Sequence, residues 1–137
     1  MKRRLFITMS VILFLSGSVL AQQKQPAAKT ADDSKAIFTL EKKSLNFGEF
    51  KMGTTKTLEI SFTNTGKKTL VLTDVYTNCG CTTVDWPKDP FPPGKSGKLK
   101  INYNPTETGP FNKLIYVYTN AQNSSETIQI EGMIIEK

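Results

Sequence analysis

Histidine is absent from the 137-residue sequence, and this absence removes several classes of enzyme. Without an imidazole there is no Ser-His-Asp or Cys-His nucleophile system, no His-Glu-x-x-His zinc protease and no histidine general base. The chain also lacks the G-x-x-x-x-G-K-[ST] phosphate loop and the G-x-G-x-x-G dinucleotide fingerprint. We therefore expect a protein that is not an enzyme and has no catalytic residues.

Arginine is confined to Arg3 and Arg4. The formal charge of +6 falls to +3 when Lys2, Arg3 and Arg4 are set aside. Because the planar fork of arginine is the preferred group for phosphates and guanine edges, a domain without arginine is poorly suited to nucleic acid. We expect no nucleic-acid partner and interpret the remaining lysines as solvated turn and edge residues.

A membrane span needs about 20 consecutive apolar residues, and no such run occurs. The stretch from Leu5 to Leu15 is shorter, follows a basic head, and precedes small residues with Val19 and Ala21 at the positions that signal peptidases favour. We predict that residues 1–21 are a secretory signal peptide and that the protein is periplasmic or secreted, with no membrane span after cleavage. No cysteine follows Ala21 at the cleavage point, so we expect no lipid anchor.

The rest of the sequence divides into two parts. Residues 22–36 contain no apolar residue larger than alanine, which predicts a flexible tether with little to bury. Residues 37–137 suit one domain. Short alternating apolar and polar runs there are separated by glycine, proline and asparagine, and no helix-length window shows a 3.6-residue period.

Eight runs are predicted as strands: 37–40, 44–50, 57–64, 70–78, 82–86, 98–104, 112–120 and 126–136. Seven or eight short strands in about 100 residues are typical of an all-β fold with two sheets. The predicted fold is an immunoglobulin-like antiparallel β-sandwich.

The tripeptide aromatic-Thr-Asn occurs at 62–64, 76–78 and 118–120, and each copy closes a predicted strand. Asparagine suits strand ends because it tolerates left-handed backbone angles and because its side chain can mimic a turn. The repeat therefore places the next residue after its second copy, Cys79, just past a strand end.

Cysteine occurs only at Cys79 and Cys81, with Gly80 between them. In a regular strand their Cα atoms would be about 6.6 Å apart, whereas a disulfide needs Cβ atoms about 3.8 Å apart. A bridge therefore requires a turn, which Gly80 permits because it has no Cβ to clash. Closing this three-residue ring is worth roughly 1.6 kcal/mol, a small stabilisation. Three interpretations stay open: a local disulfide or thiol pair that shapes the turn, a redox pair, or a metal site.

A metal site made by these cysteines would favour a soft ion such as Cu(I), which thiolates select. Zinc is less suited, because two cysteines and no histidine leave two of its four positions unfilled. In the immunoglobulin strand order, loops 51–55 and 105–109 share a pole with the cysteines, and loops 65–69 and 121–125 lie at the other pole. Met52 is thus a candidate third ligand beside Cys79 and Cys81. Apart from Cu(I), we expect no cofactor.

Two weaker signals lie outside the cysteine region. Trp86 stands between Asp85 and Asp89, which suggests a sugar-stacking ring beside two carboxylates, although core packing and turn formation are the commoner uses of these residues. Asn123 begins an Asn-Ser-Ser glycosylation pattern, which indicates an exposed loop.

From Leu45 to Ile134 the sequence resembles the secreted bacterial family known as domain of unknown function 1573. Its markers here are Phe47-Gly48, Gly53, Phe62-x-Asn64-x-Gly66, Cys79-Gly80-Cys81-Thr82, Pro93-Gly94, Tyr103-x-Pro105, Gly109-x-Phe111 and Thr119-Asn120. Such domains are similar to the ASPM-SPD2-Hydin and major-sperm-protein group of immunoglobulin-like sandwiches, which act as binding modules. The resemblance implies this fold and export, makes Gly80 and Thr82 part of a turn motif, and implies no catalytic residue.

These observations favour a non-catalytic exported module that binds an unknown protein or belongs to a cell-envelope assembly. The alternative is a thiol-redox or Cu(I)-binding periplasmic protein that uses Cys79 and Cys81. The isoleucine-rich terminal strand around Gly132 also suggests strand addition to a partner, unless the fold covers it.

Overall fold

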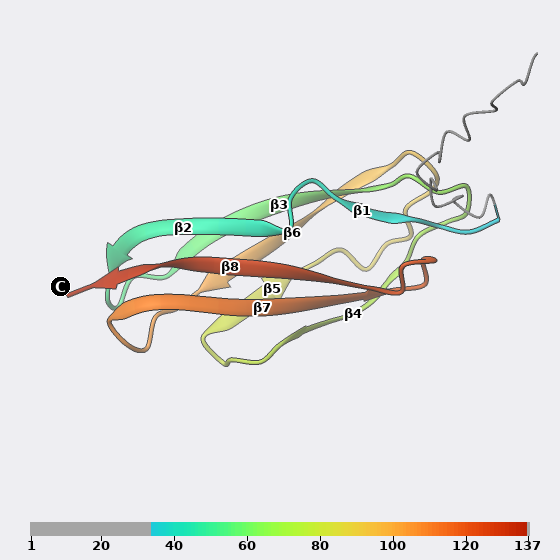
Figure 1. The fold of residues 1–137 in the computed structure, drawn as a ribbon. Helices are drawn as coiled ribbons and strands as arrows, with labels where there is room; N and C mark the ends of the chain where they lie inside the picture. The colour runs from blue at the N-terminus through green and yellow to red at the C-terminus, as the bar shows by residue number, and fades with distance from the viewer. Residues whose placement is uncertain (1–33, 137) are drawn as a thin grey trace, which may run out of the picture. The chain divides into compact units, whose positions relative to one another are not determined.

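The fold of residues 34–136, described by a computed structural model, consists of eight strands and contains no helix (Figure 1). The strands are β1 (Phe38–Leu40), β2 (Ser44–Lys51), β3 (Lys56–Asn64), β4 (Leu72–Thr77), β5 (Thr82–Asp85), β6 (Ser96–Tyr103), β7 (Gly109–Thr119) and β8 (Ser125–Ile135). Each predicted strand is present. The predicted signal peptide and most of the predicted tether lie outside the described residues. Within the described part, no helix qualifies as a membrane span.

The strands form two four-stranded sheets. The first sheet has the order β1-β3-β6-β5, and the second has the order β2-β8-β7-β4. All paired strands are antiparallel except β2 and β8, which are parallel. The chain changes sheet at every connection except β5 to β6 and β7 to β8, and the connection from β4 to β5 contains the two cysteines. The prediction of an immunoglobulin-like sandwich is confirmed.

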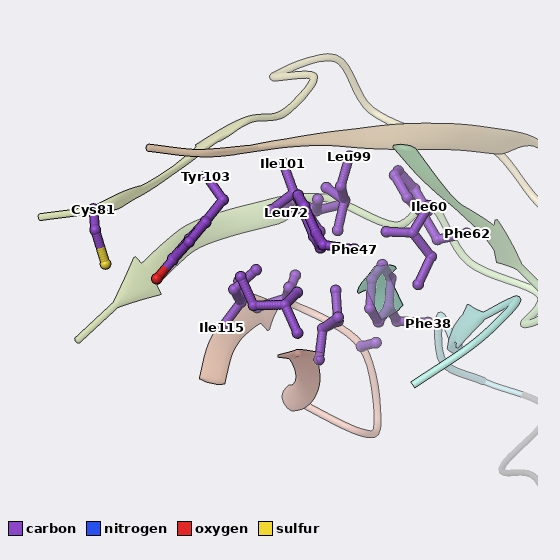
Figure 2. Packing of buried hydrophobic residues seen from close by; sticks show 14 of the residues in the cluster. Phe38, Phe47, Ile60, Phe62, Leu72, Cys81, Leu99, Ile101, Tyr103 and Ile115 are labelled. Carbon is purple, nitrogen blue, oxygen red and sulfur yellow. The ribbon is translucent and has the colours of Figure 1, made fainter. Parts of the chain in front are cut away.

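The core lies between the sheets, where the apolar residues of each alternating strand point inward (Figure 2). Ile101 from β6 and Ile115 from β7 are both fully buried. At one end the core is aromatic, with the Tyr103 ring stacked on Phe111 at 4.1 Å between centroids and the Phe47 ring inclined to these two rings by 64° and 71°. Burial and the charge of Glu107 raise the pKa of Tyr103 above its usual value.

The domain begins earlier than the sequence analysis predicted. Ala36 was assigned to the tether, yet it is only 3% exposed and its carbonyl accepts a hydrogen bond from the Gln122 N–H at 2.9 Å. The Lys35 carbonyl likewise accepts from the Lys67 N–H at 3.0 Å. Because alanine and lysine carry little apolar signal, composition alone misplaced this boundary. Loops 65–69 and 121–125, which contact residues 35 and 36 through Lys67 and Gln122, lie at one pole of the sandwich, as predicted.

The opposite pole holds the cysteines. The Asn104 N–H donates to the Cys81 carbonyl at 2.8 Å, and the Thr55 hydroxyl donates to the Asn104 side chain at 3.5 Å. Loops 51–55 and 105–109 therefore lie at the same pole as the cysteines, which confirms the predicted arrangement of loops.

The terminal strand β8 is not an edge. It pairs with β2 on one side and with β7 on the other. Of the two alternatives for the isoleucine-rich segment around Gly132, coverage within the fold is the one confirmed, because the backbone groups on both sides of β8 already form ladders within the domain.

Candidate functional site

The turn between β4 and β5 contains a disulfide that joins Cys79 to Cys81, with Cα atoms 5.2 Å apart. The two sulfur-bearing residues differ in exposure. Cys81 is only 6% exposed and packs into the core beside Tyr103 (Figure 2), whereas Cys79 is half-buried. We call residues 79–81 the cysteine turn. Because Cys79 is the more exposed of the two residues, although it also packs against the core, we call its sulfur the outer sulfur and that of Cys81 the inner sulfur.

Hydrogen bonds fix the shape of the cysteine turn. The Thr77 hydroxyl donates to the carbonyls of Cys79 (3.3 Å) and Thr82 (3.0 Å), and the Thr82 N–H donates to the Cys79 carbonyl (3.2 Å). The Cys81 N–H donates to the Cys79 sulfur at 3.1 Å. The side chain of Thr82, which belongs to the turn motif, is itself buried.

The backbone at Gly80 is not left-handed. The glycines with positive φ in the described chain are Gly48, Gly53, Gly94 and Gly109, so Gly80 has no need of left-handed freedom. A Cβ built on Gly80 would meet nothing within 4 Å beyond the two neighbouring cysteines. The absence of a side chain therefore leaves the cysteine turn uncovered and is not demanded by the backbone.

The asparagines of the aromatic-Thr-Asn repeat have distinct roles. The buried Asn64 accepts from the Gly66 N–H (3.1 Å) and donates to the Phe91 carbonyl (2.8 Å). Asn120 accepts from the Val71 N–H at 2.8 Å. The side chain of Asn78 is exposed and makes no hydrogen bond within residues 34–136. No described non-glycine residue has positive φ, so the expected left-handed asparagines are absent from this part of the chain.

Met52 lies at the pole of the cysteine turn and packs half-buried against the core. Its N–H donates to the Ile135 carbonyl at 2.9 Å. In the described chain no three His, Cys, Asp or Glu residues are grouped as a metal site. Because Cys79 and Cys81 are bonded to each other, they offer no thiolate in this form. The Cu(I) hypothesis therefore concerns the reduced pair and stays a prediction.

The other two signals have structural roles here. The Lys88 Nζ lies 2.7 Å from the centroid of the half-buried Trp86 ring, and the Asn102 amide donates to Asp85 at 3.0 Å. The lysine thus covers one face of the ring. The Asn123 amide both donates to the Phe38 carbonyl (2.6 Å) and accepts from its N–H (3.0 Å), so it ties the β7–β8 loop to β1.

The outer faces of the two sheets differ in chemistry. On the first sheet, polar side chains of neighbouring strands are paired, as between Lys98 and Glu59 (2.9 Å) and between Thr57 and Asn102 (2.7 Å). Polar side chains that already bond to one another leave few hydrogen-bond donors and acceptors on this face for a partner.

The second sheet carries all the exposed large hydrophobic residues of the described chain: Tyr76 (54% exposed), Tyr118 (41%) and Met133 (40%). The rings of Tyr76 and Tyr116 face each other across β4 and β7 with centroids 6.3 Å apart. The hydroxyls of Tyr76, Tyr116 and Tyr118 make no hydrogen bond to any residue between 34 and 136. We call Tyr76, Tyr116 and Tyr118 the tyrosine face.

Sequence reasoning missed the tyrosine face, although a signal was present. Tyr116 and Tyr118 alternate with Ile115 and Val117, so one pair must point outward if the other is in the core. Toward the other end of the same sheet, Met133 borders an open hollow of about 640 Å³ that also touches Pro110, Asn112 and Glu131. Met133 is thus separate from the tyrosine face and stands beside polar residues.

The family described as Protein of unknown function (DUF1573) matches residues 38–134, nearly the whole of the eight-stranded domain. The chain belongs to this family. The predicted resemblance is thereby confirmed. No curated protein matches the sequence.

Several solved structures are similar to this member of the family. A protein of unknown function from Porphyromonas gingivalis W83 matches with a TM-score of 0.65 and 22% identity over 72% of this chain and 46% of that chain, so the family member spans about half its length. The ASH / PapD-like domain 7 of human CEP192 has a TM-score of 0.60 at 15% identity over 93% of this chain and 99% of that one. The MSP-domain protein SSP-19 of Caenorhabditis elegans has a TM-score of 0.54 at 12% identity over 69% and 98%. These likenesses establish the immunoglobulin-like fold and nothing more.

Proposed function

We propose that this protein is a non-catalytic, exported β-sandwich that binds a protein partner through the tyrosine face of its second sheet. The observation that carries the proposal is the contrast between the two outer faces. Polar pairs occupy the first sheet, while exposed aromatic rings without hydrogen-bond partners in the domain occupy the second. Export itself rests on the predicted signal peptide.

The chemistry of the tyrosine face suits a protein partner. Tyrosine and methionine are enriched at protein interfaces, and tyrosine buries a large area at a low cost in side-chain entropy. Tyr76 and Tyr116 hold each other in place across the strands, so part of the ordering cost is met before binding. The free hydroxyls then offer hydrogen bonds at the rim of the contact.

Most strand edges are less suited to binding. β1 has three residues and β5 has four, too few for a long ladder with a partner strand. On β4 the Val75 N–H donates to the Asp74 carboxylate at 2.8 Å, which withdraws that donor from a partner. A partner is therefore expected to dock on the face of the second sheet.

Site-specific photocrosslinking in the producing cells tests the proposal. A photoreactive residue placed at Tyr118 should link the exported chain to a discrete protein. The same residue at Glu59, on the face of the first sheet, is the matched control and should give no such product. Adding Tyr76→Ser to the Tyr118 crosslinking variant should weaken the product by several-fold, since a truncated interface aromatic typically costs at least about 1 kcal/mol.

The result that contradicts the proposal is also defined. Equal crosslinking from positions 118 and 59, or a product from position 59 alone, would show that the tyrosine face has no special role. The absence of any crosslinked protein from position 118 in the exported chain would likewise count against a protein partner.

A further inference from the structure

The strand β7 is paired on both sides for only part of its length. Its ladder with β8 runs from Gly109 to Tyr118, but its ladder with β4 stops at the pair Thr77 and Ile115. Figure 1 shows β7 running on past the end of β4. The segment from Gly109 to Leu114 therefore has a partner strand on one side only. We call it the open half of β7.

The open half of β7 presents a free backbone donor. The Thr119 N–H points toward β8 and donates to the Ser124 carbonyl at 2.9 Å. The next N–H, that of Asn120, points away from β8 and donates to the Val71 carbonyl at 3.1 Å. Since successive residues of a strand alternate in direction, the Asn112 N–H also points away from β8. The chain beyond Thr77 leaves this edge, so the Asn112 N–H meets no acceptor within residues 34–136.

The cysteine turn lies where this edge opens. Cys79 is two residues beyond Thr77, the last residue of β4 that pairs with β7. An extended peptide that continued the interrupted β4 ladder along β7 would therefore start beside Cys79. The missing side chain of Gly80 leaves this approach clear, because nothing else lies within 4 Å of the position.

We propose that the Cys79–Cys81 disulfide exchanges with a dithiol in an extended segment of another exported polypeptide, which adds as a strand to the open half of β7. This inference is independent of the tyrosine face. It assigns to the domain a thiol–disulfide exchange activity, with an extended protein dithiol as the substrate class.

The exchange starts at the outer sulfur. A thiolate of the substrate attacks the half-buried Cys79 sulfur, since Cys81 is only 6% exposed. A bond forms between the substrate sulfur and Cys79, the Cys79–Cys81 bond breaks, and its electron pair leaves on Cys81, which takes up a proton. The Thr82 hydroxyl lies 3.9 Å from the Cys81 sulfur and can donate to it.

The second substrate thiolate then attacks the substrate sulfur in the mixed disulfide, and Cys79 leaves. The Cys81 N–H, 3.1 Å from the Cys79 sulfur, is positioned to stabilise the negative charge on that leaving group. In total, two substrate thiols become one disulfide, and the Cys79–Cys81 disulfide becomes two thiols. No further reactant is needed for this single exchange.

Two matched peptides test the strand-addition part. One is a reduced ten-residue peptide of alternating valine and threonine with two cysteines, and the other is the same peptide with alternate backbone nitrogens methylated. Mass spectrometry follows the transfer of two hydrogens from the peptide to the full oxidised chain. The methylated peptide should react roughly tenfold more slowly, since it cannot complete a ladder. Equal rates would overturn strand addition.

Single-cysteine variants test which sulfur reacts. Cys79 in the Cys81→Ser variant should form a mixed disulfide with the oxidised peptide roughly tenfold faster than Cys81 in the Cys79→Ser variant, because a buried thiol is poorly accessible. Equal rates, or a faster Cys81, would overturn the assignment of Cys79. If neither the peptide nor dithiothreitol reduces the oxidised chain, the exchange activity itself is refuted. Glu59→Gln, on the outer face of the first sheet, should leave all these rates unchanged. These rates are measured with the purified chain and the peptides alone, so their outcome is separate from the crosslinking test of the tyrosine face.

Discussion

The side-chain amide of Asn64 donates to the carbonyl of Phe91 at 2.8 Å, and thereby ties the end of β3 to the proline-rich crossing that precedes β6. The same amide donates to the Lys68 carbonyl at 2.7 Å, and its oxygen accepts from Gly66 at 3.1 Å. The Asn64 side chain is fully buried. One side chain thus satisfies backbone groups of two loops, the β3–β4 loop and the crossing between β5 and β6.

The first prediction follows from this contact. Asn64→Ala should lower the free energy of unfolding by about 3 kcal/mol, because it leaves the Gly66 N–H and the Lys68 carbonyl without their partner. Urea denaturation measures the loss. Asn78→Ala is the matched control from the same repeat and should change the stability by less than about 0.5 kcal/mol, since Asn78 is exposed and unbonded within the domain. Similar losses for both variants would contradict the argument.

The repeat also shows how far the sequence could be interpreted. It correctly placed Asn64, Asn78 and Asn120 at strand ends, because a strand that stops needs a polar residue there. It did not distinguish the buried Asn64 from the exposed Asn78. That difference depends on which loops cross near each strand end, and these loops come from distant parts of the chain, as with Phe91 and Asn64.

The candidate surfaces were less predictable for a related reason. Alternation along β7 separates Tyr116 and Tyr118 from Ile115 and Val117, but it does not state that β4 brings Tyr76 to the same face. The open half of β7 likewise depends on where β4 leaves the sheet. Strand pairing sets both features, and pairing partners are separated in sequence by some 40 residues. The cysteines themselves were found directly, because a rare residue type needs no partner to be noticed.

The second prediction compares two glycines of the second sheet and its neighbouring turn. Gly132→Ala should destabilise the domain by roughly 1 to 3 kcal/mol, because the new Cβ would lie 2.7 Å from the Phe111 ring and 2.8 Å from the Gly48 carbonyl. Gly80→Ala should change stability by less than about 0.5 kcal/mol, since its Cβ would point into open space. Thermal unfolding of both variants measures the two losses of stability. A larger loss for Gly80→Ala would mean that the turn requires glycine for its backbone after all.

The third prediction concerns acid stability. Burial alone would raise the pKa of Glu126, but hydrogen bonds from Lys43 (2.7 Å) and Asn123 (3.0 Å), together with the charge of Lys43, lower that pKa below its usual value of 4.5. A carboxyl with a lowered pKa stabilises the fold above its unfolded-state pKa, and this stabilisation is lost as the pH falls through the folded-state pKa.

Unfolding experiments between neutral pH and pH 3 measure this loss. Glu126→Gln should flatten the decline in stability below about pH 4.5, because the amide does not titrate. Glu59→Gln, which removes a more exposed ion pair with Lys98, should retain the decline seen in the unaltered protein. An unchanged decline in Glu126→Gln would show that the contacts of Glu126 do not contribute to acid stability.

The last prediction concerns whether the disulfide of the cysteine turn is required for the fold. The Cys79–Cys81 ring spans three residues, so its closure restricts the unfolded chain very little, and the chain-entropy relation assigns it roughly 1.6 kcal/mol. A bridge that joined the two sheets across the sandwich would contribute about 4 kcal/mol by the same relation. The turn is also held without the disulfide, through the Thr77 hydroxyl and the backbone of Thr82.

We therefore expect the domain to remain folded after reduction of the disulfide, with a loss of no more than about 2 kcal/mol in the free energy of unfolding. Urea denaturation with and without dithiothreitol gives the loss, and Cys79→Ser/Cys81→Ser should match the reduced protein. Cooperative unfolding on reduction alone would show that the disulfide is a structural requirement, and a protein that must stay oxidised to stay folded is poorly suited to exchange.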